Sequence, residues 1–237
     1  MKTILITGIT SELIAPFVAE ISKNDNIKII GTFNNSIPQL DKNNIELHKV
    51  NMSKEQELSD FLRFLKDSNI DYFLQSHGDC ASSEHFERLN PNDIYTDLNV
   101  NLISTIRILQ VIVSSMKRNN FGRVLLISTA SAQYGGGITT FSYGLSKSGL
   151  LYTVKAMAKE YTKYNILTNA IAPGFFNTKF HFQRAKKTEQ SFKERLKFVR
   201  IGRWGQPQEL NSIIKTLLLD NTFISGEVVK VDGADFI

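Results

Sequence analysis

The sequence places a tyrosine and a lysine four residues apart, Tyr143 and Lys147, within the stretch 141–161. Apolar residues recur in this stretch at spacings of three and four, which predicts one amphipathic helix. Residues four apart share a helix face, so the phenol and the ammonium can reach the same small volume. A nearby cation favours the phenolate and lowers the pKa of a tyrosine from about 10. The pair therefore predicts a general acid/base, Tyr143, with Lys147 adjusting its pKa.

A tyrosine four residues before a lysine also occurs in helices where the tyrosine packs and the lysine is solvated. The catalytic interpretation therefore needs elements that build a ligand site around this helix. Expected strands cover residues 2–7, 27–33, 45–50, 71–75, 123–128, 166–172 and 227–231. Expected helices cover residues 11–22, 53–65, 94–117, 141–161, 188–200 and 207–219, with Ser53 as an N-cap.

This alternation indicates an α/β protein with a doubly wound parallel sheet and helices on both faces. No linker or internal repeat interrupts residues 1–237, so we expect one domain. Ligands of such sheets bind beyond the carboxyl ends of the strands. Those ends carry Thr7-Gly8, Phe33-Asn34, Asn51, Gln75–Gly78, Ser128–Ser131 and Pro173-Gly174. Because Tyr143 starts the helix after one of them, the polar residues are expected to gather at one edge.

The bulk composition restricts the class of protein. With 42% hydrophobic and 22% charged residues, the 237-residue chain suits a soluble globular domain with a buried core. The net charge of +5 is spread along the chain, so we expect no nucleic-acid partner. The single Cys80 excludes an internal disulfide and a cysteine zinc site. The N-terminal apolar run is too short for a signal peptide and no segment approaches about 18 apolar residues, so we expect no membrane contact and a cytoplasmic location.

Several motifs together give the chain a resemblance to the short-chain dehydrogenase/reductase family over almost its entire length. The matching motifs are Asn101 in Leu-Asn-Val-Asn-Leu, Tyr143-x-x-x-Lys147, and residues 170–178, 201–207 and 225–233. The resemblance implies a Rossmann-like fold and an NAD(P)(H)-dependent oxidoreductase that interconverts a ketone or aldehyde and an alcohol. It also implies a homotetramer or homodimer built through the long helices.

The resemblance assigns roles to single residues. Tyr143 would donate or accept the proton, Lys147 would also hold the nicotinamide ribose, and Asn101 would hold a water that links Lys147 to solvent. The residues implied at the cofactor are Thr7, Gly8, Thr10, Ser11, Leu13, Phe33, Asn34, Asn51, Met52, Ser76, His77, Gly78, Tyr143, Lys147, Pro173, Gly174, Phe176 and Thr178.

The turn after the first strand departs from the family pattern Thr-Gly-x-x-x-Gly-x-Gly. Thr7 and Gly8 are present, but Glu12 and Ile14 replace the two later glycines. A side chain at the second glycine crowds a pyrophosphate, and a carboxylate repels it unless Glu12 turns outward to solvent. We expect the cofactor to bind with the start of the helix slightly shifted.

The active-site hydroxyl of the family is open between two residues. The usual offset from Tyr143 falls on Ala130, which has no hydroxyl. Thr129 takes the place if the following loop is one residue longer, and Ser131 is the competing choice. Either hydroxyl can bond a substrate carbonyl oxygen or merely cap the turn, and we favour Thr129.

His77 stands where the family has an alanine in Asn-Asn-Ala-Gly. The pKa of a histidine is ordinarily near neutrality, which invites a catalytic role. The resemblance instead implies backbone contact with the cofactor ribose and support for the sheet, which we favour. His48, His85 and His181 have no partner at metal-ligand spacing, so we expect no metal.

The choice of nicotinamide cofactor depends on the end of the second strand. An acidic residue there selects NAD, and a basic one accepts the 2′-phosphate of NADP. Residues 32–35 are neither acidic nor basic, and the absence of an acid slightly favours NADP(H) over NAD(H).

The segment 179–203, a mobile lid in related proteins, is strongly basic. Its basic residues are Lys179, Arg184, Lys186, Lys187, Lys193, Arg195, Lys197, Arg200 and Arg203, against Glu189 and Glu194. Such a lid would favour a small-molecule carbonyl substrate that is anionic or carrier-bound. The alternative is a solvated helix surface.

Two other functions stay open. A non-catalytic relative that binds a nucleotide fits the lost glycines, but it has no need for Asn101, Tyr143 and Lys147 together. An enoyl reductase also fits a glycine-poor turn, although those enzymes generally place the tyrosine and lysine farther apart.

Overall fold

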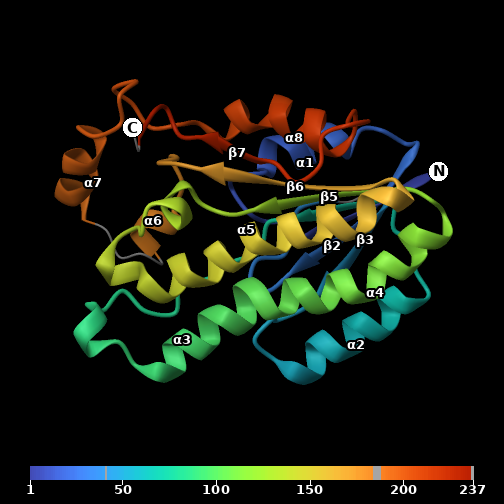
Figure 1. Ribbon diagram of the computed structural model, residues 1–237, viewed down its shortest axis with the longest axis horizontal. Helices are drawn as coiled ribbons and strands as arrows, with labels where there is room; N and C mark the ends of the chain where they lie inside the picture. The colour runs from blue at the N-terminus through green and yellow to red at the C-terminus, as the bar shows by residue number, and fades with distance from the viewer. Residues whose placement is uncertain (41, 184–187, 236–237) are drawn as a thin grey trace.

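A seven-stranded sheet forms the centre of the computed structural model, which describes residues 1–40, 42–183 and 188–235 (Figure 1). The strands are β1 (Lys2–Thr7), β2 (Ile27–Phe33), β3 (Ile45–Lys49), β4 (Tyr72–Gln75), β5 (Gly122–Ile127), β6 (Ile166–Pro173) and β7 (Val228–Val231). They pair in parallel in the order β3-β2-β1-β4-β5-β6-β7. The direction of winding reverses between β1 and β4, and this is where ligands of doubly wound sheets bind. The expected sheet is confirmed.

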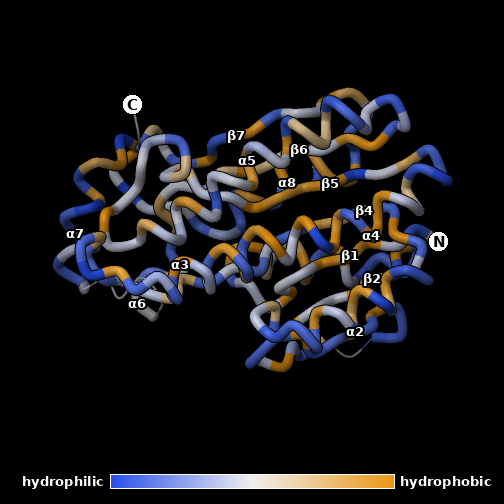
Figure 2. Tube along the Cα trace, turned by 60° about the horizontal axis from the view of Figure 1, so that its bottom comes forward, coloured by the Kyte–Doolittle hydropathy of each residue, from blue (hydrophilic) through white to orange (hydrophobic). Residues whose placement is uncertain are grey.

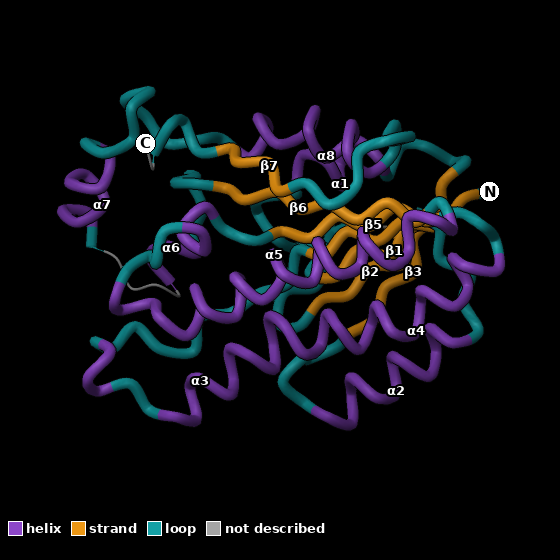
Figure 3. Tube along the Cα trace, viewed as in Figure 1, coloured by secondary structure: helices purple, strands orange, loops and turns teal. Residues whose placement is uncertain are grey.

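Helices cover both faces of the sheet, as the sequence predicts (Figures 1 and 3). One face carries α2 (Glu55–Lys66), α3 (Pro91–Leu98), α4 (Ser104–Arg118) and α5 (Phe141–Tyr161). The other carries α1 (Ala15–Ile21) and α8 (Asn211–Leu218). Two short helices, α6 (Phe180–Gln183) and α7 (Glu189–Leu196), lie beyond the carboxyl end of the sheet.

Two apolar cores hold these layers together. Leu5 of β1 points into the core under α2, α4 and α5, while its neighbours Ile4 and Ile6 point into the core under α1 and α8. A strand buried on both faces has no polar side, which explains why β1 reads as an unbroken apolar run. Figure 2 shows the same alignment of apolar residues along the strands. Each fully buried aliphatic side chain contributes about 1.5–3 kcal/mol to this packing.

Three predicted helix starts are wrong, and one of them is the start expected at residue 94, since α3 begins at Pro91. Residues 11–14 form turns, and α1 begins only at Ala15 with Pro16 in its first turn, where a missing N–H does no harm. The second helix begins at Glu55, and Ser53 does not cap it. The Ser53 hydroxyl instead donates to Asn51 Oδ1 at 2.7 Å, because Asn51 closes its own turn after β3.

The long helix expected at 94–117 contains a change of geometry. Between α3 and α4, residues Asn99–Ile103 form a π-helical turn. Such turns often mark functional sites. Here it contains Asn101, one of the predicted site residues. The expected helix 207–219 is likewise divided, because residues Pro207–Leu210 form a 3-10 turn before α8.

The run Pro91–Arg118 is, among the described residues, the one helix long and apolar enough to cross a membrane by length and composition. The expectation that no segment reaches this threshold is therefore corrected. Its apolar side chains have another use here, because Ile108, Ile112 and Met116 are buried in the core against the sheet. Core helices of this kind pass the same test, so the run is weak evidence for membrane insertion.

Asn169 in β6 provides a test of how the edge strand is held. Its buried amide donates to Ile224 O at 2.8 Å and accepts from Glu227 N–H at 3.0 Å, just before β7. Asn169→Leu should lower the free energy of unfolding by about 2–4 kcal/mol, because both backbone groups lose their partner. Urea unfolding measures this, with exposed Asn43→Ala as the control. An unchanged urea midpoint in Asn169→Leu would contradict it.

Candidate active site

A cleft of about 890 Å³ opens at the carboxyl ends of the strands. This volume is within the range of small-molecule and cofactor sites. Both candidate hydroxyl residues, Thr129 and Ser131, line it. The expected cofactor residues that line it are Thr10, Ser11, Leu13, Asn34, Asn51, Met52, Ser76, His77, Gly78, Tyr143, Lys147, Pro173, Gly174, Phe176 and Thr178. The structure therefore brings most of the predicted residues together.

Four predicted residues lie behind the cleft and do not line it. Thr7 is fully buried, and its hydroxyl bonds His77 Nδ1 at 2.7 Å. Gly8 has a φ of +70°, and a Cβ there would lie 2.6 Å from His77 Cα. Phe33 packs against the core under α1 and α8, and Asn101 is fully buried. These residues support the cleft wall, and the cofactor contacts expected of Thr7, Gly8 and Phe33 stay predictions, as does the water expected at Asn101.

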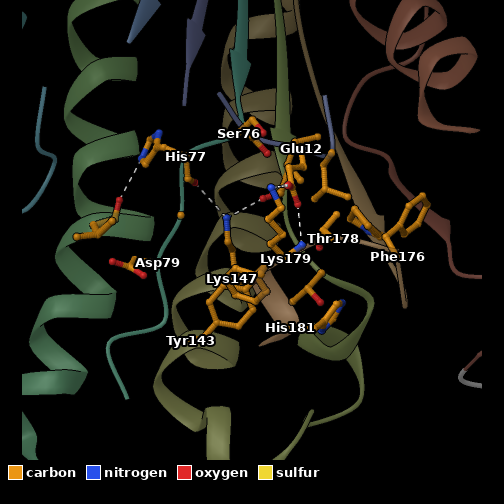
Figure 4. A pocket seen from close by; sticks show the side chains of 18 of the residues that line it. Glu12, Ser76, His77, Asp79, Tyr143, Lys147, Phe176, Thr178, Lys179 and His181 are labelled. Atoms are coloured by element: carbon orange, nitrogen blue, oxygen red, sulfur yellow. Dashed lines mark hydrogen bonds and ion pairs between the residues drawn. The ribbon is translucent and has the colours of Figure 1, made fainter. Parts of the chain in front are cut away.

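Lys147 is buried on the floor of the cleft (Figure 4). Its Nζ donates to Ile127 O at 2.9 Å and to His77 O at 3.5 Å, at the ends of β5 and β4. Loss of hydration lowers the pKa of Lys147 to about 7. The amine therefore changes charge near neutrality, and a nearby anion would favour its charged form.

The Tyr143 ring lies against Phe180 of α6 at a centroid distance of 5.2 Å, and Lys147 Nζ is 5.9 Å from its centroid. Burial raises the pKa of Tyr143, and the electrostatic effects of nearby Cys80 and Asp97 raise it further. The expected lowering of this pKa by Lys147 is therefore reversed in the structure. Desolvation acts on both groups, so the phenol keeps its proton while the amine tends to lose its charge.

The Asn101 side chain holds the main chain of the loop after β4 by hydrogen bonds. Its Oδ1 accepts from Asp79 N–H at 2.8 Å, and its Nδ2 donates to Asp79 O and to Ser146 Oγ, both at 2.9 Å. Asn101 and Lys147 both border Gly78. A Cβ added to Gly78 would lie 3.2 Å from Asn101 Oδ1 and 3.2 Å from Lys147 Nζ, so the two side chains lie close together. The π-helical turn thus aims Asn101 at the loop after β4 and at α5.

The two candidate hydroxyls are neighbours, with Thr129 Oγ1 and Ser131 Oγ 3.1 Å apart. Either can reach a ligand in the cleft, so the choice between them stays open. Ser128, which the sequence did not single out, also lines the cleft. Its hydroxyl donates to Lys147 O at 2.9 Å and so joins β5 to α5.

His77 is a structural histidine. Its Nε2 lies 3.0 Å from Val100 O, a carbonyl that can only accept, so Nε2 carries the proton and Nδ1 accepts from Thr7. Burial and the charge of Lys147 lower the pKa of His77 to about 3. A neutral imidazole with both nitrogens bonded cannot act as an acid at neutral pH, which agrees with the favoured supporting role. Among the described residues, no group of three or more His, Cys, Asp or Glu could hold a metal ion.

The two side chains that replace glycines in the turn after β1 lie in different places. Ile14 is fully buried in the core under α1 and α8 and does not enter the cleft. Glu12 does enter it and reaches across to the segment after β6 (Figure 4). Its carboxylate accepts from Lys179 N–H at 2.6 Å and lies 3.4 Å from Lys179 Nζ. Glu12 therefore does not simply turn outward to solvent, since the backbone N–H and the amine of Lys179 both attract its carboxylate.

The donor set of the cleft fits a dinucleotide. The Ser76 hydroxyl is buried and has no hydrogen-bond partner among the described residues, although Ser76 lines the cleft. Hydroxyls and amides of Thr10, Ser11, Asn51 and Thr178 face the same space. At the end of β2, the lining residues are Thr32, Asn34, Asn35 and Ser36, without an acid or a base. Glu12 opposes a bound phosphate, because its carboxylate lies in the turn after β1 where the family pattern has a glycine.

Aromatic residues and an ion pair that sequence analysis missed line the substrate side of the cleft. Phe180, His181 and Phe175 form a row of ring contacts, with centroid distances of 6.0 and 4.8 Å between successive rings. Arg195 of α7 follows, 5.7 Å from the Phe175 ring, and pairs with buried Asp235. The spacing of these residues gives no sequence signal, because they meet only through the fold.

The basic segment carries less available charge than its sequence suggests. Arg195 pairs with Asp235, Lys179 with Glu12, and Arg203 with Glu209 at 2.8 Å. The predicted Arg184, Lys186 and Lys187 lie outside the described residues. These pairings favour the alternative of an ordinary charged surface over a basic lid.

Comparisons with known proteins agree with this geometry. A profile of the family described as "Enoyl-(Acyl carrier protein) reductase" matches residues 26–233. Carbonyl reductase family member 4 of Xenopus laevis is 33% identical over 184 residues, covering 77% of this chain and 74% of that protein. The 3-oxoacyl-[acyl-carrier-protein] reductase FabG of Aquifex aeolicus is 28% identical over 236 residues, covering 99% and 88%. A short chain dehydrogenase from Leptospira borgpetersenii, solved with bound NAD+, has the same fold, with a TM-score of 0.85 at 19% identity over 100% of this chain and 93% of that one.

The lowered pKa of Lys147 makes a prediction for stability. Its pKa falls from 10.5 to about 7 on folding, so between these values the unfolded chain holds a proton that the folded chain lacks. The free energy of unfolding of the wild type should therefore rise with pH from this group, by at most about 1.4 kcal/mol per pH unit.

Lys147→Met should remove this rise with pH. The free energy of unfolding of Lys147→Met minus that of the wild type should therefore decrease between pH 7 and pH 9. Urea unfolding at several pH values measures it, with exposed Lys155→Met on the same helix as the control. Parallel pH curves for the wild type and Lys147→Met would contradict the lowered pKa.

Proposed function

Because the chain belongs to the short-chain dehydrogenase/reductase family, and is thereby an NAD(P)-dependent oxidoreductase, we propose that it reduces the ketone of a 3-oxoacyl thioester to an alcohol. The observation that supports this most is the position of Tyr143 and Lys147, side by side on the floor of the cleft. The acyl thioester is suggested by the 3-oxoacyl-[acyl-carrier-protein] reductase that matches nearly the whole chain. An anionic or carrier-bound substrate rests on this likeness, since the described basic residues of the lid are largely paired.

In the proposed reaction Tyr143 is the acid. When bound, the reduced nicotinamide supplies the hydride to the carbonyl carbon. Tyr143 gives its proton to the carbonyl oxygen, and its raised pKa keeps that proton in place until an alkoxide, a stronger base, develops. Thr129 or Ser131 orients the oxygen by a hydrogen bond. Lys147 contributes its positive charge once an anionic ligand favours the ammonium.

We propose NADP(H) as the cofactor. Asn34, Asn35 and Ser36 form the lining at the end of β2, so no carboxylate from that strand end repels a 2′-phosphate. Asn51 and Met52 also line the cleft, and Gly78 lies beside the Lys147 amine. The reverse preference, for NADH, would show directly in a comparison of the two affinities.

An enoyl reductase is the second candidate, favoured by the description of the matching family profile. It differs in the bond reduced, a carbon–carbon double bond next to the thioester. Oxidation of NADPH followed by absorbance, with a 3-oxobutanoyl thioester and a 2-butenoyl thioester compared at equal concentration, separates the two. Turnover of only the enoyl compound would overturn the proposed ketone reduction, and turnover of neither would favour the non-catalytic relative.

Three further properties remain proposals. Residues 1–237 would act as one domain, and a cytoplasmic location stays a prediction.

A homodimer or homotetramer would bury the outer face of the long helices, where Ile103, Leu145 and Tyr152 are 41%, 46% and 78% exposed. Exposed large apolar side chains that share a face are typical of association surfaces.

Replacing the proposed acid should separate binding from chemistry. Tyr143→Phe keeps the ring that packs on Phe180, so the Kd for NADPH should change by less than about twofold. Turnover should fall by about 10²–10⁴-fold, because no other group in the proposal donates the proton. Stopped-flow absorbance and fluorescence titration measure the two quantities. Tyr152→Phe, exposed on the same helix, is the control, and an active Tyr143→Phe protein would refute the assignment.

Removing the charge of Glu12 should tighten NADPH binding. Glu12→Gln keeps an oxygen for the Lys179 N–H but removes the repulsion of phosphates, so the Kd should fall about 3- to 10-fold, more at low salt. Fluorescence titration across a salt series measures this. Glu20→Gln removes an exposed carboxylate on α1 and should change little. Weaker binding by Glu12→Gln would mean that the carboxylate orders the site for the cofactor.

A further inference from the structure

Two polar contacts of the same kind join three segments beside the cleft. The first is made by Asn101, which holds both backbone groups of Asp79 and the Ser146 hydroxyl of α5. It thus ties the π-helical turn to the loop after β4 and to α5. Ser146 is the residue directly before Lys147.

The second contact is made by Asp97, one helical turn before Asn101. Asp97 is fully buried, and its Oδ1 accepts from Ala81 N–H at 2.8 Å. Its Oδ2 accepts from the Ser142 hydroxyl at 2.5 Å. Ser142 is the residue directly before Tyr143, and Ala81 lies two residues after Asp79. The contact therefore ties α3 to the same loop and to the same helix.

The spacing of the two contacts is matched on both helices. Asp97 of α3 and Asn101 of the π-helical turn are four residues apart, and so are Ser142 and Ser146 of α5, and each residue of the first pair contacts one residue of the second. Each contact holds the side-chain hydroxyl of the residue directly before a member of the proposed catalytic pair. A rotation of α5 that moved Tyr143 would have to break the contact at Ser142.

A buried carboxylate is a costly way to join two helices. Burial raises the pKa of Asp97, which measures the loss of hydration of its charge. An apolar residue of similar size often stabilises a fold as well as a buried polar one. An apolar residue cannot, however, accept hydrogen bonds and so cannot fix the directions of the Ala81 N–H and the Ser142 hydroxyl.

We propose that Asp97 is a positioning residue that holds the loop at Ala81 and the start of α5 at Ser142, and thereby sets the position of the Tyr143 hydroxyl in the cleft. This rests on the proposed role of Tyr143 as the acid. Asp97 itself is not among the residues that line the cleft.

The charge of Asp97 gives the contact a second, electrostatic effect. The groups facing it are Asp79 on the loop, Asp93 on its own helix, and Tyr143 on α5. Cys80 acts on the pKa of Tyr143 in the same direction as Asp97 does, and Lys147 Nζ is 5.9 Å from the centroid of the Tyr143 ring. Removing the Asp97 charge lowers the pKa of Tyr143, so the phenol should lose its proton at lower pH.

Three variants separate geometry from charge. Asp97→Asn keeps an acceptor for Ala81 N–H and a polar group for Ser142, so kcat should stay within about threefold. Asp97→Leu removes both contacts and should lower kcat about 10- to 100-fold at an unchanged KM for NADPH. Ser142→Ala should lower kcat in the same direction by a smaller factor. Asp93→Asn, one turn earlier on α3, is the control.

Amide hydrogen exchange provides a readout that does not depend on turnover. Asp97→Leu and Ser142→Ala should speed exchange at residues 79–81 and 141–143, and Asp97→Asn should not. Wild-type kcat and wild-type exchange in Ser142→Ala and Asp97→Leu would overturn the proposal, and if Asp97→Leu fails to fold, Ser142→Ala alone decides. A wild-type protein without reductase activity would instead refute the proposed function, while the exchange rates would still test the contact.

Discussion

The buried amine of Lys147 is the constraint on which the site depends. An ammonium without water needs fixed acceptors, and it takes the carbonyls of Ile127 and His77. These carbonyls stand at the ends of neighbouring strands β5 and β4, so the strands must stop in register below α5. His77 in turn is held by Thr7 at the end of β1. One side chain thereby couples three strand ends to the helix that carries Tyr143.

The fold could be predicted from sequence because its signals are local and repeated. The apolar run of β1 follows from burial of the strand on both faces, and the periodic apolar stripe of α5 follows from burial of the helix on one face. The helix α5 has the predicted bounds 141–161. The boundaries that failed depend on single side chains. The start of α2 moved because Asn51 bonds Ser53 before the helix can use it as a cap, and sequence spacing does not show such competition.

The candidate site was predictable as a set of positions, but its electrostatics were not. Spacing places Tyr143 and Lys147 on one helix face, yet the direction of the Tyr143 pKa depends on burial and on Asp97, which no local pattern reveals. Glu12 illustrates the same limit. Its identity indicates a repulsive charge, while its partner Lys179 is brought to it by β6, far along the chain. Long-range neighbours decide what a charged residue does.

The π-helical turn at Asn99–Ile103 allows one rod of chain to satisfy two different environments. A π turn accommodates one more residue than an α turn, which rotates everything before it by about 100° relative to everything after it. Past the turn, Ile108 and Ile112 pack on the sheet, while the carboxylate of Asp97 just before it and the amide of Asn101 within it face the neighbouring helix α5. An uninterrupted spiral would align these two sides and force either the oily or the hydrophilic half to face the wrong way. The extra residue of the π turn thus sets the angular offset between the apolar face of α4 and the polar side chains that contact α5.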